Sequence, residues 1–428
     1  MSELLTKNTA LKQLLDTHLD ELAAQEGLEK QTILDALAKG TMVLLGNPNH
    51  PNLRPILVGQ PASIKVNANI GTSPLCQNEL MEMQKLKVAV TAGADTVMDL
   101  SISGDLDAIR CSMLARTSVP LGTVPLYSVG EKILSAGREI SSMDPDELFD
   151  EIEKQAEQGV DFMTLHCGIS YRGARMGADK TRVMGIVSRG GSMLARWMLE
   201  NKKENPLIEH FDRLITIARK HNVTLSLGDA LRPGAGVDAG DAAQFEEVIN
   251  LGVLQQQALA EGVECMIEGP GHVPLNQVQA QIQSIKQLTH GAPLYVLGPL
   301  VVDTCPGYDH IAGAIGGAFG VVAGVDYLCY LTPAEHLTLP DSDDVKAGVM
   351  ASRIAARAGE VALGTPRAVA REAAMNKARR QLDWEGMKQA SIDPEMVDRR
   401  RAQHHDEEVC AMCGKFCAVK MLKEAKIV

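Results

Sequence analysis

The chain has 428 residues, a hydrophobic content of 45% with only 3% aromatic residues, and a formal net charge of −12. This composition favours an α/β protein over an all-β sandwich. The acidic balance argues against nucleic acid as a partner, because it repels phosphate backbones.

The first residues do not combine a basic start with an apolar stretch, so they do not resemble a signal peptide. We therefore expect a cytoplasmic protein. In that compartment the nine cysteines are expected to be thiols or metal ligands rather than disulfides.

Residues 1–60 are predicted to form an N-terminal helical segment, because residues 11–22 have helical periodicity and Gly40 closes the helical stretch. Residues 61–340 then alternate short apolar strands with amphipathic helices, which predicts a parallel (β/α)₈ barrel of the TIM type. Nine candidate strands are one too many, and the short Gly- and Arg-rich gap after His166 suggests that one strand there is a hairpin addition. The candidate strands are residues 64–69, 96–100, 122–127, 162–166, 183–188, 224–229, 265–268, 294–297 and 327–331.

Residues 311–331 are almost wholly apolar and long enough to suggest a membrane span. Asp326 interrupts the run, and its five glycines suit close helix packing before a buried strand. We therefore expect a core helix and no contact with a membrane.

Residues 341–400 are predicted to be C-terminal helices, and residues 401–428 a cluster-binding tail. The stretch 399–408 is so polar that we expect an unpacked tether. The tail carries Cys410, Cys413 and Cys417 with no fourth cysteine after them. Three thiolates can hold a [4Fe-4S] cluster with one open iron, whereas a zinc knuckle would need His404 or His405 as a fourth ligand. The tail alone does not distinguish an iron–sulfur cluster from a zinc knuckle, or either of these from a tail that binds no metal and buries its thiols.

Polar residues recur where the predicted strands end, which in a parallel barrel is the catalytic face. A single polar residue at a strand end is more often structural. Nine strand ends directing polar groups to one mouth instead indicate a binding site. These residues are Asn67, Asn69, Tyr127, His166, Ser188, Arg189, Gly190, Asp229, Arg232, Glu268, His272, Tyr295 and His336.

Chemistry suggests roles for some of them. Ser188, Arg189 and the following glycines suit a phosphate group. Glu268 and Asp229 are candidate catalytic acid and base, although each could be only a hydrogen-bond anchor. A further candidate is Cys329, as a hydrogen relay or simply as a small buried hydrophobe.

His272 and His336 each follow a strand and could share one metal, Zn²⁺ or another divalent ion. Taken singly, each histidine is better explained as a neutral core residue.

Together these residues resemble the thiamin pyrimidine synthase family, the phosphomethylpyrimidine synthases (ThiC), from about Lys65 to Cys417. The terminal cysteine motif has three residues before its last cysteine where long members have four, and the long members' N-terminal extension is absent. The matching blocks are residues 66–73, 120–127, 187–192, 267–275, 306–310 and 330–336.

The resemblance implies a non-standard radical S-adenosylmethionine (SAM) lyase on a (β/α)₈ barrel. A [4Fe-4S] cluster on Cys410, Cys413 and Cys417 would cleave SAM, and the resulting radical would attack the ribose of 5-aminoimidazole ribotide. The resemblance also implies zinc on His272 and His336, an external electron donor, and a homodimer whose tail reaches over the partner's barrel. The ribotide-binding positions would be Asn69, Met98, Tyr127, His166, Ser188, Arg189, Gly190, Asp229, Ala230, Leu231, Arg232, Glu268 and Tyr295.

The sequence departs from the family pattern at the segment 99–104 and at Cys167, Ala230 and Cys305. All four flank loops that are expected to contact the substrate. This favours the paralogous product, 5-hydroxybenzimidazole, the lower-ligand base of an anaerobic cobamide (vitamin B12). The alternative is the phosphomethylpyrimidine of thiamine biosynthesis, made from the same ribotide and SAM.

Two hypotheses from other classes stay open at this point. One is a zinc-dependent barrel hydrolase or aldolase that uses His272, His336 and Glu268, with the tail as a separate zinc knuckle. The other is a non-catalytic metal- or thiol-binding scaffold.

Overall fold

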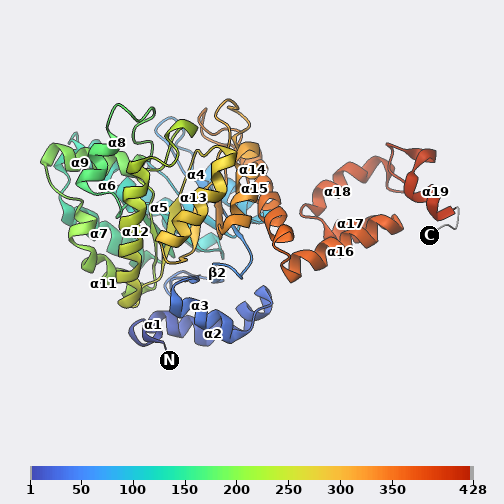
Figure 1. Ribbon diagram of the computed structural model, residues 1–428, viewed down its shortest axis with the longest axis horizontal. Helices are drawn as coiled ribbons and strands as arrows, with labels where there is room; N and C mark the ends of the chain where they lie inside the picture. Colours follow the sequence, from blue (N-terminus) through green and yellow to red (C-terminus); the bar gives the residue numbers. More distant parts are fainter. Residues whose placement is uncertain (1, 425–428) are drawn as a thin grey trace. The chain divides into compact units, whose positions relative to one another are not determined.

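The computed structural model describes residues 2–424 and divides the chain into two compact units, Met1–Gly359 and Glu360–Val428 (Figure 1). The first unit contains a closed barrel of eight parallel strands, which confirms the predicted (β/α)₈ fold. The barrel closes where β10 pairs with β3. Its strands are β3 Lys65–Ile70, β4 Thr96–Asp99, β5 Leu121–Thr123, β6 Phe162–Leu165, β7 Thr224–Leu227, β8 Cys265–Gly269, β9 Leu294–Leu297 and β10 Tyr327–Cys329.

Helices surround this barrel, and one of them, α15, runs from the first unit into the second. The helices up to that point are α1 Glu3–Lys7, α2 Thr9–Glu26, α3 Lys30–Lys39, α4 Glu79–Ala92, α5 Leu106–Arg116, α6 Pro125–Ser135, η1 Ile140–Ser142, α7 Pro145–Gln158, α8 Tyr171–Gly177, α9 Arg189–Asn201, α10 Pro206–Glu209, α11 Phe211–His221, η2 Gly236–Asp238, α12 Ala242–Ala260, α13 Leu275–Leu288, α14 Asp309–Ala323 and α15 Ser342–Ala362.

The barrel interior is filled by large side chains from neighbouring strands. Phe162 is fully buried, and Gly122 on β5 makes room for its ring, because an added Cβ would lie 2.3 Å from the ring. Burying one such side chain contributes about 1.5–3 kcal/mol. Tyr295 and Tyr327 stack with ring centroids 4.2 Å apart. This packing fills the barrel interior below the C-terminal ends of the strands.

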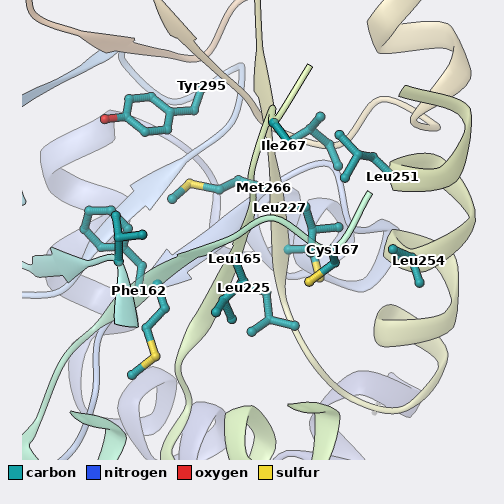
Figure 2. Packing of buried hydrophobic residues seen from close by; sticks show 14 of the residues in the cluster. Phe162, Leu165, Cys167, Leu225, Leu227, Leu251, Leu254, Met266, Ile267 and Tyr295 are labelled. Carbon is teal, nitrogen blue, oxygen red and sulfur yellow. The ribbon is translucent and has the colours of Figure 1, made fainter. Parts of the chain in front are cut away.

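Outside the barrel wall, α12 covers β7 and β8. Figure 2 shows Leu251 and Leu254 of α12 beside Leu227, Ile267 and Cys167. All five are buried in one hydrophobic cluster. Helix α12 thus packs directly behind the ends of β6, β7 and β8.

One predicted strand, residues 183–188, was wrong. Val183 is 70% exposed, and the backbone N–H groups of Val183 and Met184 donate to the carboxylate of Asp238 at 2.8 and 2.9 Å. The apolar run therefore lies in a loop, and Ser188 caps α9 instead of ending a strand. Tyr127 also lies outside the strands, because Pro125 starts α6 two residues earlier.

The N-terminal segment holds a small sheet that helical periodicity could not indicate. Strands β1 Val43–Leu45 and β2 Ile56–Val58 pair antiparallel, and they share a hydrophobic core with α1, α2 and α3. The apolar run after residue 311 forms α14, whose glycines pack against the barrel as expected: an added Cβ at Gly313 would lie 2.5 Å from Leu331. Within the described residues no helix is long and apolar enough to cross a membrane.

The second unit is helical, and the stretch 399–408 in it is exposed except at Arg401, as its polarity predicts, but it has local structure in place of the expected unpacked tether. The Arg401 guanidinium lies 3.9 Å from the ring centroid of Trp384 and donates to the carbonyl of Glu407 at 2.7 Å. The Trp384 indole N–H donates to the carbonyl of Glu408 at 3.0 Å. The elements are α16 Pro366–Gln381, α17 Trp384–Ala390, α18 Pro394–Arg401, η3 Ala402–His404, η4 Gly414–Phe416 and α19 Ala418–Glu424.

Candidate active site

A cavity of about 90 Å³ opens at the C-terminal ends of the barrel strands. Nine of the predicted site residues line it, and they come from all eight barrel strands or the segments that follow them. Hydrophobic side chains, among them Val124 and Leu297, complete the wall. The predicted residues that line the cavity are Asn69, Met98, Tyr127, His166, Asp229, Arg232, Glu268, Tyr295 and Cys329.

Glu268 is the carboxyl group best placed for proton transfer. Thr164 and Ser226 both donate hydroxyl hydrogen bonds to its Oε1, at 2.6 and 2.7 Å. The pKa of Glu268 is raised to about 7, because burial and the nearby charge of Asp229 raise it by more than the two hydrogen bonds and the Arg232 charge lower it. A carboxyl group that titrates near neutrality can give or take a proton.

Asp229 and Arg232 form an ion pair across one turn, with Arg232 Nη1 2.8 Å from Asp229 Oδ1. Burial raises the pKa of Asp229, and the Arg232 charge opposes that shift. The pair therefore places a carboxylate and a guanidinium side by side at the cavity wall.

His166 is neutral in this setting. Burial, followed by the Arg232 charge, lowers its pKa to about 3. Its Nε2 lies 2.9 Å from the hydroxyl of Ser188, the N-cap of α9. An added Cβ at Gly190 would lie 2.3 Å from the His166 ring, so glycine at this position permits the contact between α9 and β6.

Arg189, at the start of α9, stacks over the Tyr127 ring at 4.7 Å. It lines a second cavity that shares Asn69, Leu100 and Leu297 with the first, so the two cavities adjoin. Burial raises the pKa of Tyr127, which keeps the phenol protonated under the guanidinium. A cation at a helix N-terminus suits an anionic substrate group.

Cys329 ends β10 beside two asparagines. Asn69 Nδ2 lies 3.1 Å from its sulfur, and Asn67 Nδ2 donates to the Tyr295 hydroxyl at 2.8 Å. Burial raises the pKa of Cys329 to about 12. The side chain is therefore a thiol, which can donate a hydrogen atom but is a poor nucleophile.

His272 and His336 lie together, with ring centroids 5.4 Å apart. Each Nδ1 contacts a carboxylate, His272 with Asp303 at 2.8 Å and His336 with Asp309 at 3.1 Å. Among the described residues neither Nε2 has a hydrogen-bond partner. Metal-binding histidines commonly have a carboxylate on the other ring nitrogen, so this pair fits a divalent metal. His336 also lines the second cavity.

Another group of potential metal ligands in the described part of the chain lies away from this mouth. Glu153, Glu157 and His221 bring ligand atoms within 4.8 Å of one another. The Lys220 ammonium is 3.0 Å from Glu153 and 3.6 Å from Glu157, so a side-chain cation already neutralises these carboxylates.

In the second unit, the cysteine motif surrounds the short helix η4. Cys410 and Cys413 reach the surface, whereas Cys417 is buried. Hydrogen bonds from the backbone N–H groups of Met412 and Cys413 lower the pKa of Cys410. Three cysteines, one of them favouring the thiolate, are a donor set that fits an iron–sulfur cluster with one open iron.

Five predicted substrate-binding residues do not line the first cavity. Arg189 lines the second cavity, and Ser188, Gly190, Ala230 and Leu231 are buried behind the wall of the first. Ala230 and Cys167 are both fully buried, so these two departures from the family pattern do not touch the cavity directly.

The sequence analysis missed Thr164 and Ser226, the partners of Glu268, and Asp303 and Asp309, the partners of the histidines. Thr164 had a usable signal, because it lies on β6 two residues before His166, which directly follows that strand, and strand residues two apart point to the same side. Asp303 comes from a loop and Asp309 from the start of α14, and only the folded chain brings them to the histidines.

The comparison with known families decides among the open hypotheses. The model of the family described as "Radical SAM ThiC family" matches residues 6–424. The chain belongs to the radical SAM ThiC family. Membership implies that SAM and an iron–sulfur cluster are its cofactors, and that it is an enzyme acting on a small molecule. The hydrolase and scaffold hypotheses lose their support.

Curated relatives of the ThiC family match this chain along its whole length. A phosphomethylpyrimidine synthase of Caldanaerobacter subterraneus is 49% identical over 97% of this chain and 96% of its own. Another, of Desulfotalea psychrophila, is 48% identical over 95% of this chain and 94% of its own. A third, of Geobacter metallireducens, is 49% identical over 95% of this chain and 94% of its own.

Proposed function

We propose that this ThiC-family protein is a phosphomethylpyrimidine synthase, which rearranges 5-aminoimidazole ribotide into the pyrimidine phosphate of thiamine biosynthesis. The observation that carries the proposal is the near-half identity, over at least 95% of this chain, with relatives of that name. It supports this product over 5-hydroxybenzimidazole, which the sequence departures alone favoured. Two of those departures, Cys167 and Ala230, lie outside the cavity lining, which weakens the argument from them.

The ribotide would occupy the first cavity and extend to Arg189, which lies over the Tyr127 ring and lines the adjoining second cavity. Arg189 and the N-terminus of α9 would bind its phosphate. Asp229 and Glu268 would accept hydrogen bonds from ribose hydroxyls, and neutral His166 would add a further polar contact. The side chains of Met98 and Tyr295 would pack against the imidazole ring. Buried polar groups of this kind fix the orientation of a ligand before reaction.

The second cavity suits SAM, because it adjoins the first and is lined by His336. His272 and His336 would hold a divalent metal, which we propose is zinc. When bound by Cys410, Cys413 and Cys417, the cluster would supply the electron that splits SAM. A homodimer and an external electron donor also belong to this proposal, through the family resemblance.

The chain's own residues would then handle protons and hydrogen atoms. Glu268, with its pKa near 7, would take a proton from the ribose or return one to it as bonds break. The Cys329 thiol would donate a hydrogen atom to a substrate radical and become a thiyl radical, which an electron from the external donor and a proton from solvent would return to the thiol.

The test is to supply the anaerobically reconstituted protein with aminoimidazole ribotide, SAM and a reductant, and to identify the product by mass. We expect the phosphomethylpyrimidine together with 5′-deoxyadenosine. Formation of hydroxybenzimidazole would show that the proposed product is wrong, but it would leave the radical cleavage of SAM and the ribotide substrate in place. The absence of 5′-deoxyadenosine from iron-loaded protein would overturn both.

A further inference from the structure

A buried glutamate on the outer side of the barrel wall holds the turn that carries Asp229 and Arg232. Glu247 lies in the first turns of α12 and is 2% exposed. Its Oε1 accepts the backbone N–H of Ala230 at 2.9 Å, and its Oε2 accepts that of Leu231 at 2.7 Å. Glu247 does not line the first cavity. One carboxylate thus satisfies two consecutive buried N–H groups, which would otherwise lack partners.

The turn 229–232 is closed from its other side by its own end residues. The Arg232 N–H donates to the carbonyl of Asp229 at 3.2 Å, and the side chains pair at 2.8 Å. Both of these side chains line the cavity. Residues 230 and 231 therefore face Glu247, while residues 229 and 232 face the substrate site. If the backbone of residues 230 and 231 moved relative to the Glu247 carboxylate, the side chains of Asp229 and Arg232 would move with it.

The same helix also holds the loop after β6, which follows His166. Asn250 Nδ2 donates to the carbonyl of Gly168 at 3.0 Å. An added Cβ at Gly168 would lie 2.9 Å from Glu247 Cγ, so the loop backbone packs directly against the glutamate. Two cavity-forming segments, one after β6 and one after β7, thus contact the start of α12.

We propose that Glu247 is a positioning residue that fixes the place of the Asp229–Arg232 ion pair at the cavity wall. The two hydrogen bonds that its carboxylate accepts thereby determine the rate of turnover of the ribotide. The effect on ribotide turnover rests on the proposed function, whereas the position of the turn rests only on the hydrogen bonds to Glu247. Glu247 does not touch the substrate, and it acts through the two backbone N–H groups.

The discriminating variant is Glu247→Gln, which keeps the size but replaces one acceptor oxygen with an NH₂ group that faces an N–H donor. Because small misplacements of reacting groups are costly, we expect kcat to fall on the order of 10²-fold, with a smaller change in KM. The matched control is Glu246→Gln. Glu246 is the neighbouring carboxylate on α12 and binds the Ser170 hydroxyl at 2.6 Å, away from the turn. Its kcat should stay within about 3-fold of wild type.

Two further measurements test the role of Glu247, one on the folded Glu247→Gln variant and one on the wild-type protein in case that variant does not fold. A crystal structure of Glu247→Gln should show the Asp229–Arg232 contact lengthened or broken. If the variant does not fold, amide hydrogen exchange of the wild-type peptide 228–233 should be slow. An unchanged turn with unchanged kcat, or fast exchange in the wild-type peptide, would overturn the role of Glu247.

Failure of the proposed function gives a different pattern. Wild-type protein would then form no pyrimidine from the ribotide. The crystal structure and the exchange measurement would still test whether Glu247 holds the turn 229–232 in place. If wild type is active and both glutamine variants lose kcat equally, Glu247 has no special part and the proposal is wrong.

Discussion

The barrel unit and the C-terminal unit hold their functional groups in opposite ways. In the barrel, Glu268, His166 and Asp229 are buried and fixed by hydrogen bonds or an ion pair. Around the cysteine motif, Met412 is 91% exposed and Phe416 is 82% exposed. A preorganised site suits the rearrangement proposed above, whereas the cysteine motif would be completed by the cluster that we propose it binds. The difference teaches that, in this proposal, the substrate site is built into the fold and the cofactor is added to it.

The largest expected effect is a loss of activity that comes from the C-terminal unit and leaves the stability of the barrel unit unchanged. Cys413→Ala should abolish 5′-deoxyadenosine formation, because two thiolates cannot hold the cluster. Iron content should fall, while the thermal unfolding of the barrel should not change. Cys111→Ala is the control, because it removes an exposed cysteine on α5. Full activity in Cys413→Ala would show that the motif is not the cluster site.

The next effect lies within the barrel. Glu268→Gln should lower kcat by about 10²–10⁴-fold, the usual range for losing a general acid or base. Iron content and cluster spectra should match wild type. The control is Glu264→Gln, just before the other end of β8, where the carboxylate accepts the Leu44 N–H at 3.0 Å. Equal losses in both variants would argue for a general folding defect.

A smaller effect tests the electrostatics of Glu268. The Thr164 hydrogen bond stabilises the ionised carboxylate and so lowers its pKa. Thr164→Val should therefore move the limb of the pH profile of kcat/KM that lies near pH 7 to higher pH. Ser226→Ala should move it in the same direction, and Glu268→Gln should remove that limb. A shift to lower pH would contradict the assignment.

The smallest effect concerns the folded segment before the cysteines. Arg401→Ala removes the stacking on Trp384 and the hydrogen bond to Glu407, a loss of about 1 kcal/mol. We expect cluster loss in air to become a few-fold faster, measured by the decay of visible absorbance. Arg400→Ala, its exposed neighbour, is the control. Identical decay in the two variants would mean that this contact does not support the motif.

The barrel could be predicted because strand and helix periods alternate clearly along the sequence. The false strand at 183–188 shows the limit: its apolar residues satisfy a strand pattern, but Asp238 takes its backbone N–H groups. The three-residue strands β1 and β2 are too short to leave a periodic signal.

The site was predictable where polar residues follow strands, as at His166, Asp229 and Glu268. Sequence could not tell which side of the turn 229–232 faces the substrate, so Ala230 and Leu231 were assigned with Asp229 and Arg232. The turn's orientation depends on Glu247, which is distant in sequence and joins it only in the folded chain. The partners Asp303 and Asp309 depend on tertiary structure in the same way.

The most direct test of the account follows a hydrogen atom from the barrel site to the cleaved cofactor. Ribotide deuterated on its ribose is incubated with reduced, iron-loaded protein and SAM, and the 5′-deoxyadenosine is analysed by mass. The account predicts deuterium in that nucleoside for wild type. Unlabelled 5′-deoxyadenosine alongside normal product would contradict it.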